Sequence, residues 1–460
     1  MGQSSKPPEA ANKLKPSLKP RHIVMVSLGG TLGAGLFIGI AEPLAHVGPL
    51  GTMLAYAMAG LVMLATMMCL GELSTSFPHA GSFQYYAYKF FPNKQLSYVI
   101  GWMYWLSWVF ALAAGLIAGG IISNELCPDI PVWGWCAGYL LLLTLLNCLS
   151  ARAFGECEYW LAFIKVFAII FFIICGCYLI YLKMHGGWQP ELRVHGSYFP
   201  NGWTAVIECM AVVIYSFQGA EVVGNIASEA KNPSEVLPKV IRGIGVRIVL
   251  FYILSVGVLA ILEPEGYTAE ASGPFVSVFK ELGIPGTDTF MKLVILSATL
   301  SAANSGIYVC SRMLWSMGNA GMAPKCFSKL SGKRVPTRAI LLCSALSLVC
   351  IFTRSIDAQR LFVFLIASTA QVGCAAWIVI AACQLKYRSL IEEGLYEPVK
   401  GAYRTPLNPF TGWFVIVVNT LIIAGGWFGP DGLHMFLSEL VLLIILLVNY
   451  RYFYAGKKNG

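Results

Sequence analysis

Four glycines fall within seven residues near the N-terminus, in the run GGTLGAG at residues 29–35. A glycine lowers helix stability by about 1 kcal/mol relative to alanine, so this run predicts an interruption in an otherwise apolar helix. The interruption would leave free N–H groups at the start of one half-helix and free C=O groups at the end of the other. The N–H groups suit the carboxylate of a small molecule, and the C=O groups suit an ammonium ion or another cation. We therefore expect residues 29–35 to form one half of a binding site, with close helix packing through small residues as the alternative.

A second interruption is predicted at residues 216–221, which read SFQGAE inside an apolar stretch. A polar residue, a glycine and an acid in such a stretch cannot face lipid without a cost in free energy. Interrupted backbone is tolerated at membrane depth where it is buried in protein or lines a water-filled cavity. The first interruption falls in the first apolar segment and the second in the sixth. Two interrupted helices at corresponding positions of two halves are typical of transporters built from inverted repeats, whose site lies near the bilayer midplane.

Lys165 is the most informative charge in the sequence. It lies about nine residues into an apolar segment, which corresponds to a depth of roughly 14 Å at about 1.5 Å per residue. That depth is near the middle of a hydrocarbon core about 30 Å thick, too far for the ammonium group to reach the headgroups. Burial disfavours the charged form of a lysine, so such a group can exchange a proton at neutral pH. We expect Lys165 to couple protons to the binding site, with a fixed structural cation as the alternative.

Carboxylates accompany the second interruption. Glu221 could bind a substrate, carry a proton, or cap the second half-helix through its dipole. Glu208 lies two turns before the interruption, where it could face an outer vestibule and attract cationic substrates, or lie near the membrane interface. Asn304 is polar within an apolar segment and is expected to face the protein interior. Inner-gate or structural ion pairs are predicted for charged residues near the cytoplasmic ends of the segments, namely Glu72, Glu156, Glu158, Glu229 and Arg312.

The elements that position these residues are transmembrane helices. Of the 460 residues, 57% are hydrophobic and 12% are charged, whereas soluble domains carry about 25% charged residues. A helix needs about 20 apolar residues to cross the hydrocarbon core, and such runs recur along almost the whole chain. The sequence predicts an all-α integral membrane protein with about twelve spans, near 22–41, 48–70, 95–122, 131–150, 156–182, 204–226, 239–262, 288–317, 336–353, 359–383, 409–428 and 433–454.

The charge distribution predicts the orientation of these spans. Most of the 32 lysines and arginines fall in segments on the same side as the N-terminus. The positive-inside rule therefore places both termini in the cytoplasm, with tails at 1–21 and 455–460. No removable signal peptide is evident, so the first span is expected to direct insertion. The net charge of +9 is attributed to topology, and no nucleic-acid partner is predicted. The 14 cysteines show no metal-type spacing and are expected to be reduced packing residues.

The sequence resembles the amino acid–polyamine–organocation superfamily, and most closely its bacterial amino acid permease branch. The order and spacing of many short stretches carry the resemblance across nearly the whole length. They are GGTLGAGLF (29–37), GEL (71–73), FPHAG (77–81), FGE (154–156), EYW (158–160), IKV (164–166), SFQGAE (216–221), EAKNP (229–233), PK (238–239), SAANSGIY (301–308), SRML (311–314), GMAP (321–324) and VP (335–336).

The resemblance implies a LeuT-type fold of five plus five inverted repeats, here 22–182 and 204–383, with two appended helices in 409–454. It also implies proton-coupled uptake of an amino acid across the plasma membrane, here a bacterial inner membrane. A lysine on the fifth span of related transporters occupies the place where sodium-coupled relatives bind a cation. Mapped onto this sequence, the substrate carboxylate would meet backbone amides around Thr31, Gly33, Ala34 and Gly35. The amino group would meet carbonyls near Tyr215, Phe217, Gln218 and Gly219, with Glu221 beside them and the two aromatic residues as candidate gates.

One departure from the family bears on specificity. Many relatives place a carboxylate on the third span at the position of Gly115. Its absence removes an anchor for a cationic side chain and favours neutral substrates slightly, although Glu208 could supply the charge.

The sequence as a whole favours an amino acid:proton symporter that works by alternating access, with protons as the coupling ion and no other cofactor. An amino acid exchanger, a polyamine or organic-cation transporter, and a membrane sensor that binds amino acids without moving them are the alternatives. Sodium coupling is disfavoured because the ammonium of Lys165 would compete for the same carbonyls. An enzyme is not predicted, since no paired histidines, metal-ligand spacing or nucleophile elbow is found.

Overall fold

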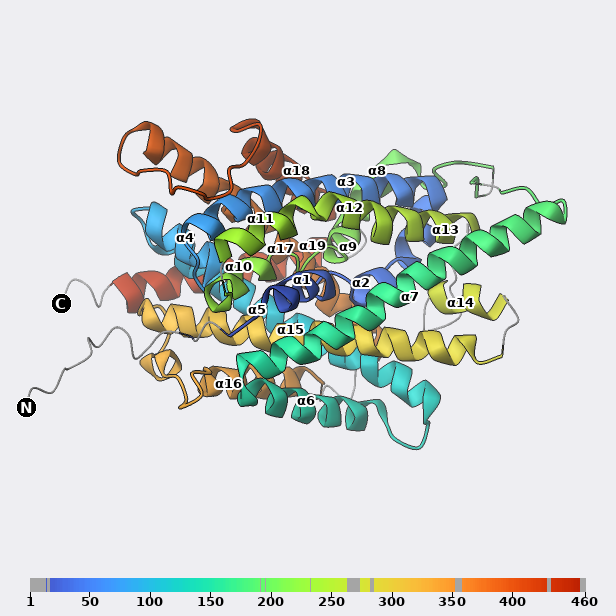
Figure 1. The fold of residues 1–460 in the computed structure, drawn as a ribbon, viewed down its shortest axis with the longest axis horizontal. Coiled ribbons are helices and arrows are strands. Elements are labelled where there is room, and N and C mark those ends of the chain that lie inside the picture. Colours follow the sequence, from blue (N-terminus) through green and yellow to red (C-terminus); the bar gives the residue numbers. More distant parts are fainter. Residues whose placement is uncertain are drawn as a thin grey trace, which may run out of the picture.

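The computed structural model describes residues 14, 17–190, 192–194, 196–231, 233–262, 274–281, 285–351, 358–427 and 432–455. Its regular elements in these ranges are helices, accompanied by two isolated β-bridges, Leu18 with Ala230 and Val194 with Ser197. Most of the long helices run along the longest dimension of the molecule (Figure 1). The architecture is therefore a helical bundle, as the sequence predicts.

The long helices are apolar enough to cross a membrane. Seven helical segments meet both the length and the composition that a span requires, and three shorter apolar helices of 10–17 residues accompany them within the described ranges. The principal helices are α3 (Ala41–Ser76), α5 (Gln95–Leu126), α6 (Val132–Leu149), α7 (Ala151–His185), α15 (Thr287–Asn319), α16 (Thr337–Ile351), α17 (Ala358–Glu392), α18 (Phe410–Gly426) and α19 (Gly432–Asn449).

Two helical segments are interrupted near the middle of the bundle. The first consists of α1 (Pro20–Gly29) and α2 (Ala34–Phe37), joined by turns and bends. The second consists of α8 (Gly202–Glu208), α9 (Met210–Tyr215) and α10 (Val222–Ile226), with turns at residues 216–221. Figure 1 shows α1, α2, α9 and α10 in the central part of the view. Both interruptions lie where the glycine-containing runs predict them.

Small residues bring α5 and α15 close together along their length. A Cβ atom added to Gly115 would lie 3.1 Å from the carbonyl oxygen of Thr299, and one added to Gly306 would lie 3.3 Å from the Cβ atom of Leu112. Such close backbone approach is typical of helix pairs in membranes, where van der Waals packing replaces the hydrophobic effect. The helices α5 and α15 pack together beside the interrupted helices.

Several shorter elements complete the bundle. They are α4 (Ser82–Phe90), η2 (Ala227–Glu229), α11 (Pro233–Arg242), α12 (Ile244–Arg247), η3 (Ile248–Ile253), α13 (Leu254–Leu262), α14 (Pro274–Glu281), η4 (Lys325–Ser328) and η5 (Tyr450–Ala455). The segment that precedes α1 is tied to the end of the second interrupted helix, because the N–H groups of Ser17 and Leu18 both donate to the carbonyl oxygen of Glu229 at 3.0 Å.

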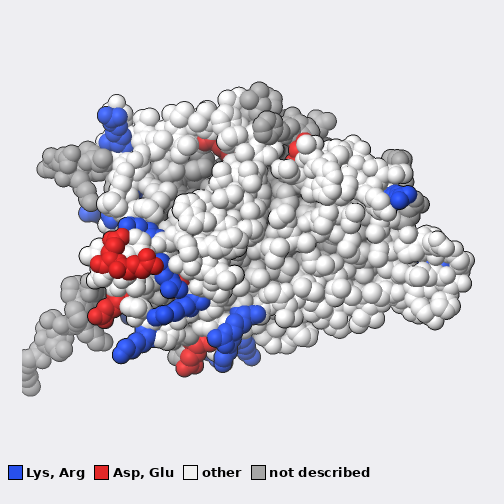
Figure 2. All heavy atoms as spheres, turned by 90° about the horizontal axis from the view of Figure 1, so that it is seen from above, with Lys and Arg blue, Asp and Glu red and all other residues white. Residues whose placement is uncertain are grey.

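The charged side chains are unevenly distributed along the bundle. Figure 2 shows that Lys, Arg, Asp and Glu gather toward the left end, the same end at which Figure 1 places α4, and that a broad middle band is almost uncharged. Large apolar side chains are exposed on the outer helices, including Leu141 of α6, Trp160 and Ile174 of α7, and Leu421 of α18. An exposed apolar belt of this kind suits a lipid environment.

Candidate functional site

One pocket is lined by residues from both interruptions and from three neighbouring helices. It has a cavity volume of about 40 Å³ and receives contributions from the turn after α1, from α2, from residues 215–221, and from α5, α15 and α17. This volume is well below the range of small-molecule sites, about 300–1,000 Å³, so the surrounding helices are packed closely around the pocket. The lining residues are Gly30, Thr31, Gly33, Gly35, Tyr104, Ser107, Trp108, Ala111, Gly115, Tyr215, Gln218, Glu221, Ala302, Thr369 and Gly373.

Two glycines allow the interruptions to cross in direct contact. A Cβ atom on Gly219 would collide with the carbonyl group of Gly30, and one on Gly35 would lie 2.8 Å from the Cα atom of Ser216. Gly219 also has a φ angle of +100°, a conformation that residues with a Cβ atom rarely adopt. Glycine is therefore required here for both steric and conformational reasons.

Tyr252 joins the two interruptions from the side. Its hydroxyl oxygen lies 3.0 Å from the carbonyl oxygen of Thr31 and 2.9 Å from the carbonyl oxygen of Ser216. The single hydroxyl proton is therefore shared between two carbonyls that accept no hydrogen bond within a helix. Tyr56 adds a hydrogen bond of 3.0 Å between its hydroxyl and that of Ser216. The hydroxyl of Thr31 in turn donates to the carbonyl oxygen of Leu28 at the end of α1. These bonds fix the turns that face the pocket.

Glu221 anchors the second interruption to two neighbouring helices. Its carboxylate accepts hydrogen bonds from the hydroxyl of Tyr104 at 2.8 Å, from Nε1 of Trp377 at 3.3 Å and from the backbone N–H of Gly219 at 3.1 Å. The side chain of Glu221 makes no capping bond to α10. Its carboxylate is buried and also lines the pocket. The hydrogen bond between the Glu221 carboxylate and a backbone N–H group is therefore made with the turn before Glu221, and not with α10, the half-helix that follows it.

We expect Tyr104→Phe to weaken substrate binding without unfolding the protein. The change removes one of three donors to the Glu221 carboxylate and keeps the aromatic ring, so the loss should be about 1–3 kcal/mol, or about 5- to 150-fold in the dissociation constant. Binding of labelled substrate to the purified variant measures this loss. Tyr98→Phe is the matched control, because Tyr98 lies on the same helix and donates to Asn449, away from the pocket. Equal losses in both variants would contradict a role of Tyr104 at the site.

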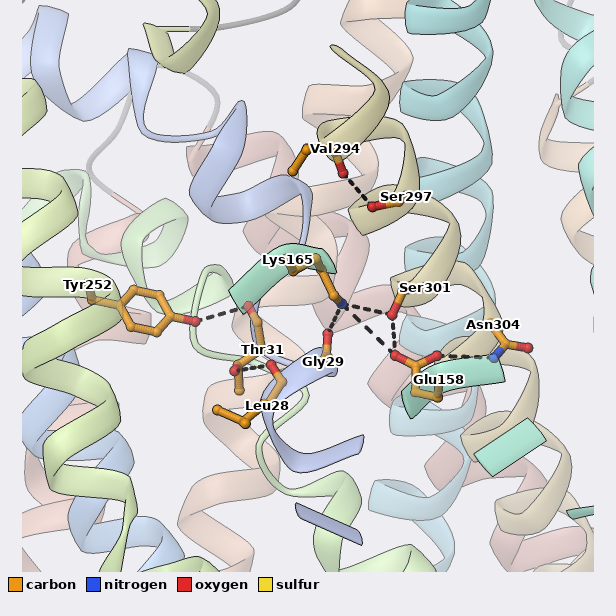
Figure 3. Close-up of polar contacts among 10 residues, drawn as sticks. All are labelled: Leu28, Gly29, Thr31, Glu158, Lys165, Tyr252, Val294, Ser297, Ser301 and Asn304. Carbon is orange, nitrogen blue, oxygen red and sulfur yellow. Dashed lines mark hydrogen bonds and ion pairs between the residues drawn. The ribbon is translucent and has the colours of Figure 1, made fainter. Parts of the chain in front are cut away.

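Lys165 binds the end of the first half-helix (Figure 3). Its Nζ atom donates to the carbonyl oxygen of Gly29 at 2.5 Å and to the hydroxyl of Ser301 at 2.7 Å, and the side chain is fully buried. A cation at this place compensates the negative end of the α1 dipole and satisfies a carbonyl that the interruption leaves free. Lys165 therefore connects α7 to the interruption without entering the pocket.

Glu158 lies beside Lys165 and is also fully buried. Its Oε1 atom is 4.0 Å from the Nζ atom of Lys165 and accepts a short hydrogen bond from the hydroxyl of Ser301. Its Oε2 atom accepts from Nδ2 of Asn304 at 3.1 Å, and Asn147 donates to Oδ1 of Asn304 at 2.8 Å. The sequence groups Glu158 with the carboxylates at the cytoplasmic ends of the spans. The spacing of seven residues, two helical turns, was the signal that it shares a face with Lys165.

The structure brings seven of the predicted binding residues to the pocket lining, namely Thr31, Gly33, Gly35, Gly115, Tyr215, Gln218 and Glu221. Gln218 is held in place by a hydrogen bond of 2.7 Å from its Nε2 atom to the carbonyl oxygen of Ala370. Ala34 begins α2, and its side chain lies outside the described part. Seven further lining residues on α5, α15 and α17 were not predicted, because small or aromatic residues in an apolar span are indistinguishable from packing residues: Tyr104, Ser107, Trp108, Ala111, Ala302, Thr369 and Gly373.

The other predicted residues are not among those that line the pocket. Phe217 is fully buried and stacks on Tyr252 with ring centroids 4.1 Å apart. Gly219 forms the crossing with the first interruption, and Asn304 belongs to the Glu158 cluster. Glu208 pairs with His46 at 3.5 Å and is partly exposed.

The remaining predicted ion pairs are present away from the pocket. Glu72 lies 2.5 Å from Nε of Arg388, Glu156 lies 2.6 Å from Arg21, and Glu229 lies 3.0 Å from Arg312. Among the residues that the structure describes, no group of three or more His, Cys, Asp or Glu side chains is placed to hold a metal ion.

Comparison with known proteins gives consistent matches over nearly the full length. A family model described as amino acid permease matches residues 22–455. The amino-acid permease RocC of Bacillus subtilis is 38% identical over 428 residues, which cover 91% of this chain and 90% of the relative. The gamma-aminobutyric acid permease of the same species is 35% identical, with 98% and 96% covered. The lysine-specific permease LysP of Escherichia coli is 33% identical, with 89% and 86% covered.

Proposed function

The chain belongs to the amino acid permease family, and from this premise we propose that it takes up an amino acid together with protons by alternating access. Members of this family are multi-pass membrane transporters, not enzymes. The observation that carries proton coupling is the contact between Lys165 and the Gly29 carbonyl, because it ties a buried amine to the end of α1, directly before the turn that lines the pocket.

The family implies a LeuT-like fold, and we propose the full arrangement of five plus five inverted repeats. The repeats would comprise residues 22–182 and 204–383, and 409–454 would supply two appended helices, giving twelve spans. The two interruptions, five predicted spans apart, support this division. Both termini would lie in the cytoplasm of a bacterial cell, in agreement with the charged end of the bundle in Figure 2.

The substrate would lie between the two interruptions. Its carboxylate would meet the backbone N–H groups around Thr31, Gly33, Ala34 and Gly35, and its ammonium would meet carbonyls near residues 215–219. The support is that one pocket borders both turns and that glycine lets a ligand approach the backbone closely. Tyr215 lines the pocket and remains a candidate gate. The contacts of Phe217 with Tyr252 favour a role in supporting the turn.

Proton coupling at Lys165 would act through the first interruption. The protonated amine holds the Gly29 carbonyl with a charge-assisted hydrogen bond, which is roughly twice as strong as a neutral one. Loss of the proton would weaken that bond and free the turn that borders the substrate. Sodium is disfavoured as the coupling ion, because the ammonium already occupies the carbonyl that a cation would need.

Uptake by purified protein in liposomes tests the proposal. A panel of labelled amino acids is offered with an imposed inward proton gradient, with and without a protonophore. Accumulation that collapses with the protonophore supports symport, and the panel identifies the substrate. Uptake that ignores the gradient and requires amino acid inside the liposome would instead establish an exchanger, in which Lys165 is a structural cation.

A neutral amino acid is the favoured substrate. The named relatives differ in what their names say they carry, lysine in one and gamma-aminobutyric acid in another, so similarity alone does not select a substrate. Gly115 borders the pocket without a side chain, and Glu221 is engaged by three donors. The pocket therefore offers little free negative charge to a cationic side chain. For the same reason, a polyamine or another organic cation is less well matched to this pocket.

We expect Glu208→Gln to slow uptake of cationic amino acids and to leave neutral ones unchanged. Glu208 is partly exposed and lies outside the pocket lining, so it would act on the approach of a cationic substrate through long-range electrostatic attraction. We expect this attraction to change the uptake rate by about 2- to 10-fold and to weaken as the ionic strength rises. Initial rates for lysine and for a neutral amino acid at low and high salt measure it. Glu281→Gln is the control, because Glu281 is paired with Lys183. A salt-independent or equal loss for both substrates would contradict the vestibule role.

A further inference from the structure

We propose that Glu158 is the proton acceptor for Lys165, and that the hydroxyl of Ser301 relays the proton between them. This inference rests on the proposed coupling of transport to protons at Lys165 and names the group that receives the proton next. The relay is formed by residues of α7 and α15, outside the substrate pocket.

The three side chains form a directed chain of hydrogen bonds (Figure 3). Nζ of Lys165 donates to Oγ of Ser301 at 2.7 Å, and Oγ of Ser301 donates to Oε1 of Glu158. The direct separation of amine and carboxylate is 4.0 Å, too long for a hydrogen bond, so the hydroxyl completes the path. All three residues are fully buried, which leaves neither charged group free access to water.

The proton transfer along this chain is balanced. An N–H bond of the Lys165 ammonium breaks as the Ser301 oxygen gains that proton, and the O–H bond of Ser301 breaks as Oε1 of Glu158 gains its proton. Ser301 ends as a hydroxyl, Lys165 as a neutral amine and Glu158 as a neutral acid. Because a buried ion pair has a large desolvation penalty, its conversion to two neutral groups is feasible in this environment.

The surroundings position the carboxylate for this role. Asn304 donates a hydrogen bond to Oε2 of Glu158, and Asn147 orients the amide of Asn304 by donating to its Oδ1 atom. Oε1 of Glu158 therefore remains available to accept from Ser301. A Cβ atom on Gly29 would lie 2.7 Å from Oε1 of Glu158, so glycine at the end of α1 makes room for the carboxylate there.

The charged and titratable neighbours are few among the described residues. Lys165 is the charged group that acts on Glu158, and the thiol of Cys157 is adjacent on α7. From the helices packed against it, α1 contributes the Gly29 backbone, α6 contributes Asn147, and α15 contributes Ser301 and Asn304. His22 of α1 faces Glu156 instead.

The relay also has a direction. Glu158 is seven residues closer than Lys165 to the start of α7 at Ala151, a rise of about 10 Å along the helix axis. The start of α7 lies on the side proposed as cytoplasmic. A proton passed from Lys165 to Glu158 therefore moves toward the compartment into which a symporter releases it.

Two variants, Glu158→Gln and Ser301→Ala, test the relay in liposomes. Proton-driven net uptake and the accompanying proton influx are compared with substrate counterflow, in which the proton can stay bound. We expect both variants to retain counterflow and to lose net uptake by about a hundredfold, since a positioned proton acceptor contributes about 10²–10⁴-fold. The pH dependence of net uptake should flatten, a change that a purely structural role would not produce. Glu156→Gln, on the same helix but paired with Arg21, is expected to keep the wild-type profile.

The outcomes separate this inference from the proposed function. If the wild-type protein shows no proton-driven uptake, symport itself fails and the relay fails with it. If the wild-type protein is proton-driven and Glu158→Gln shows the same net rate and pH profile, symport stands and the relay is overturned. If Glu158→Gln loses counterflow as well, the result for Ser301→Ala decides whether the relay stands, because that variant keeps the charges of both Lys165 and Glu158. Wild-type net uptake in that variant would then overturn the relay.

Discussion

Proton-driven accumulation is expected to disappear in Lys165→Ala, while counterflow of bound substrate survives. The substitution removes the donor to the Gly29 carbonyl and the group that exchanges the coupling proton, but it leaves the pocket lining unchanged. It also leaves the Glu158 carboxylate buried without its partner, and breaking a buried pair costs about 3–5 kcal/mol. Accumulation in liposomes, counterflow and thermal unfolding of the purified variant measure the three effects.

Two further variants control for loss of stability. Lys165→Ala combined with Glu158→Gln removes the unpaired charge, so we expect it to regain stability but not accumulation. Lys183→Ala removes a lysine from the other end of α7 that pairs with Glu281 at 2.5 Å, and it should transport normally. Concentrative uptake by Lys165→Ala at the wild-type level would refute coupling at this residue.

Gly219→Ala is expected to eliminate substrate binding. Alanine at φ +100° is strained by about 1–2 kcal/mol. The larger effect is steric, because the added Cβ would collide with the carbonyl group of Gly30, and backbone cannot move aside as a flexible side chain can. The two interruptions would have to separate, which changes the pocket that they share. Binding of the substrate identified by the uptake panel, measured on detergent-purified protein, tests this expectation.

The matched control for this variant is Gly245→Ala on α12. A Cβ atom on Gly245 would meet nothing within 4 Å, so alanine there should leave binding unchanged. Purification yield and a monodisperse elution profile show whether Gly219→Ala still folds. Wild-type affinity in a folded Gly219→Ala protein would mean that the crossing of the two interruptions does not shape the site.

The positions of both interruptions were predictable because helix interruption is a local property. Glycines at 29–35 and at 219 lower helix stability wherever the chain is placed, and the surrounding apolar residues identify the segments as spans. Lys165 was predictable for a related reason, since a lysine so far from either end of an apolar span has to be buried. These predictions depend on residues that are neighbours in the sequence.

Side-chain directions within the interruptions were not predictable. Tyr215 ends α9 and Phe217 lies in the turn that follows, yet Tyr215 lines the pocket and Phe217 stacks on Tyr252. A turn imposes no regular periodicity on its side chains, unlike a helix or strand. Their separation into a pocket residue and a packing residue depends on what the neighbouring helices place against them.

The sequence by itself determined the class of fold, the two interruptions and the buried lysine, because composition and propensity act locally. Only the tertiary structure decided the partners of the buried charges. Glu221 is bound by Tyr104 and Trp377, which are 117 and 156 residues away, and Glu158 meets Ser301 across 143 residues. A buried carboxylate must find donors wherever the packed helices bring them. Which helices those are is fixed by the packing of the whole bundle and not by any local pattern.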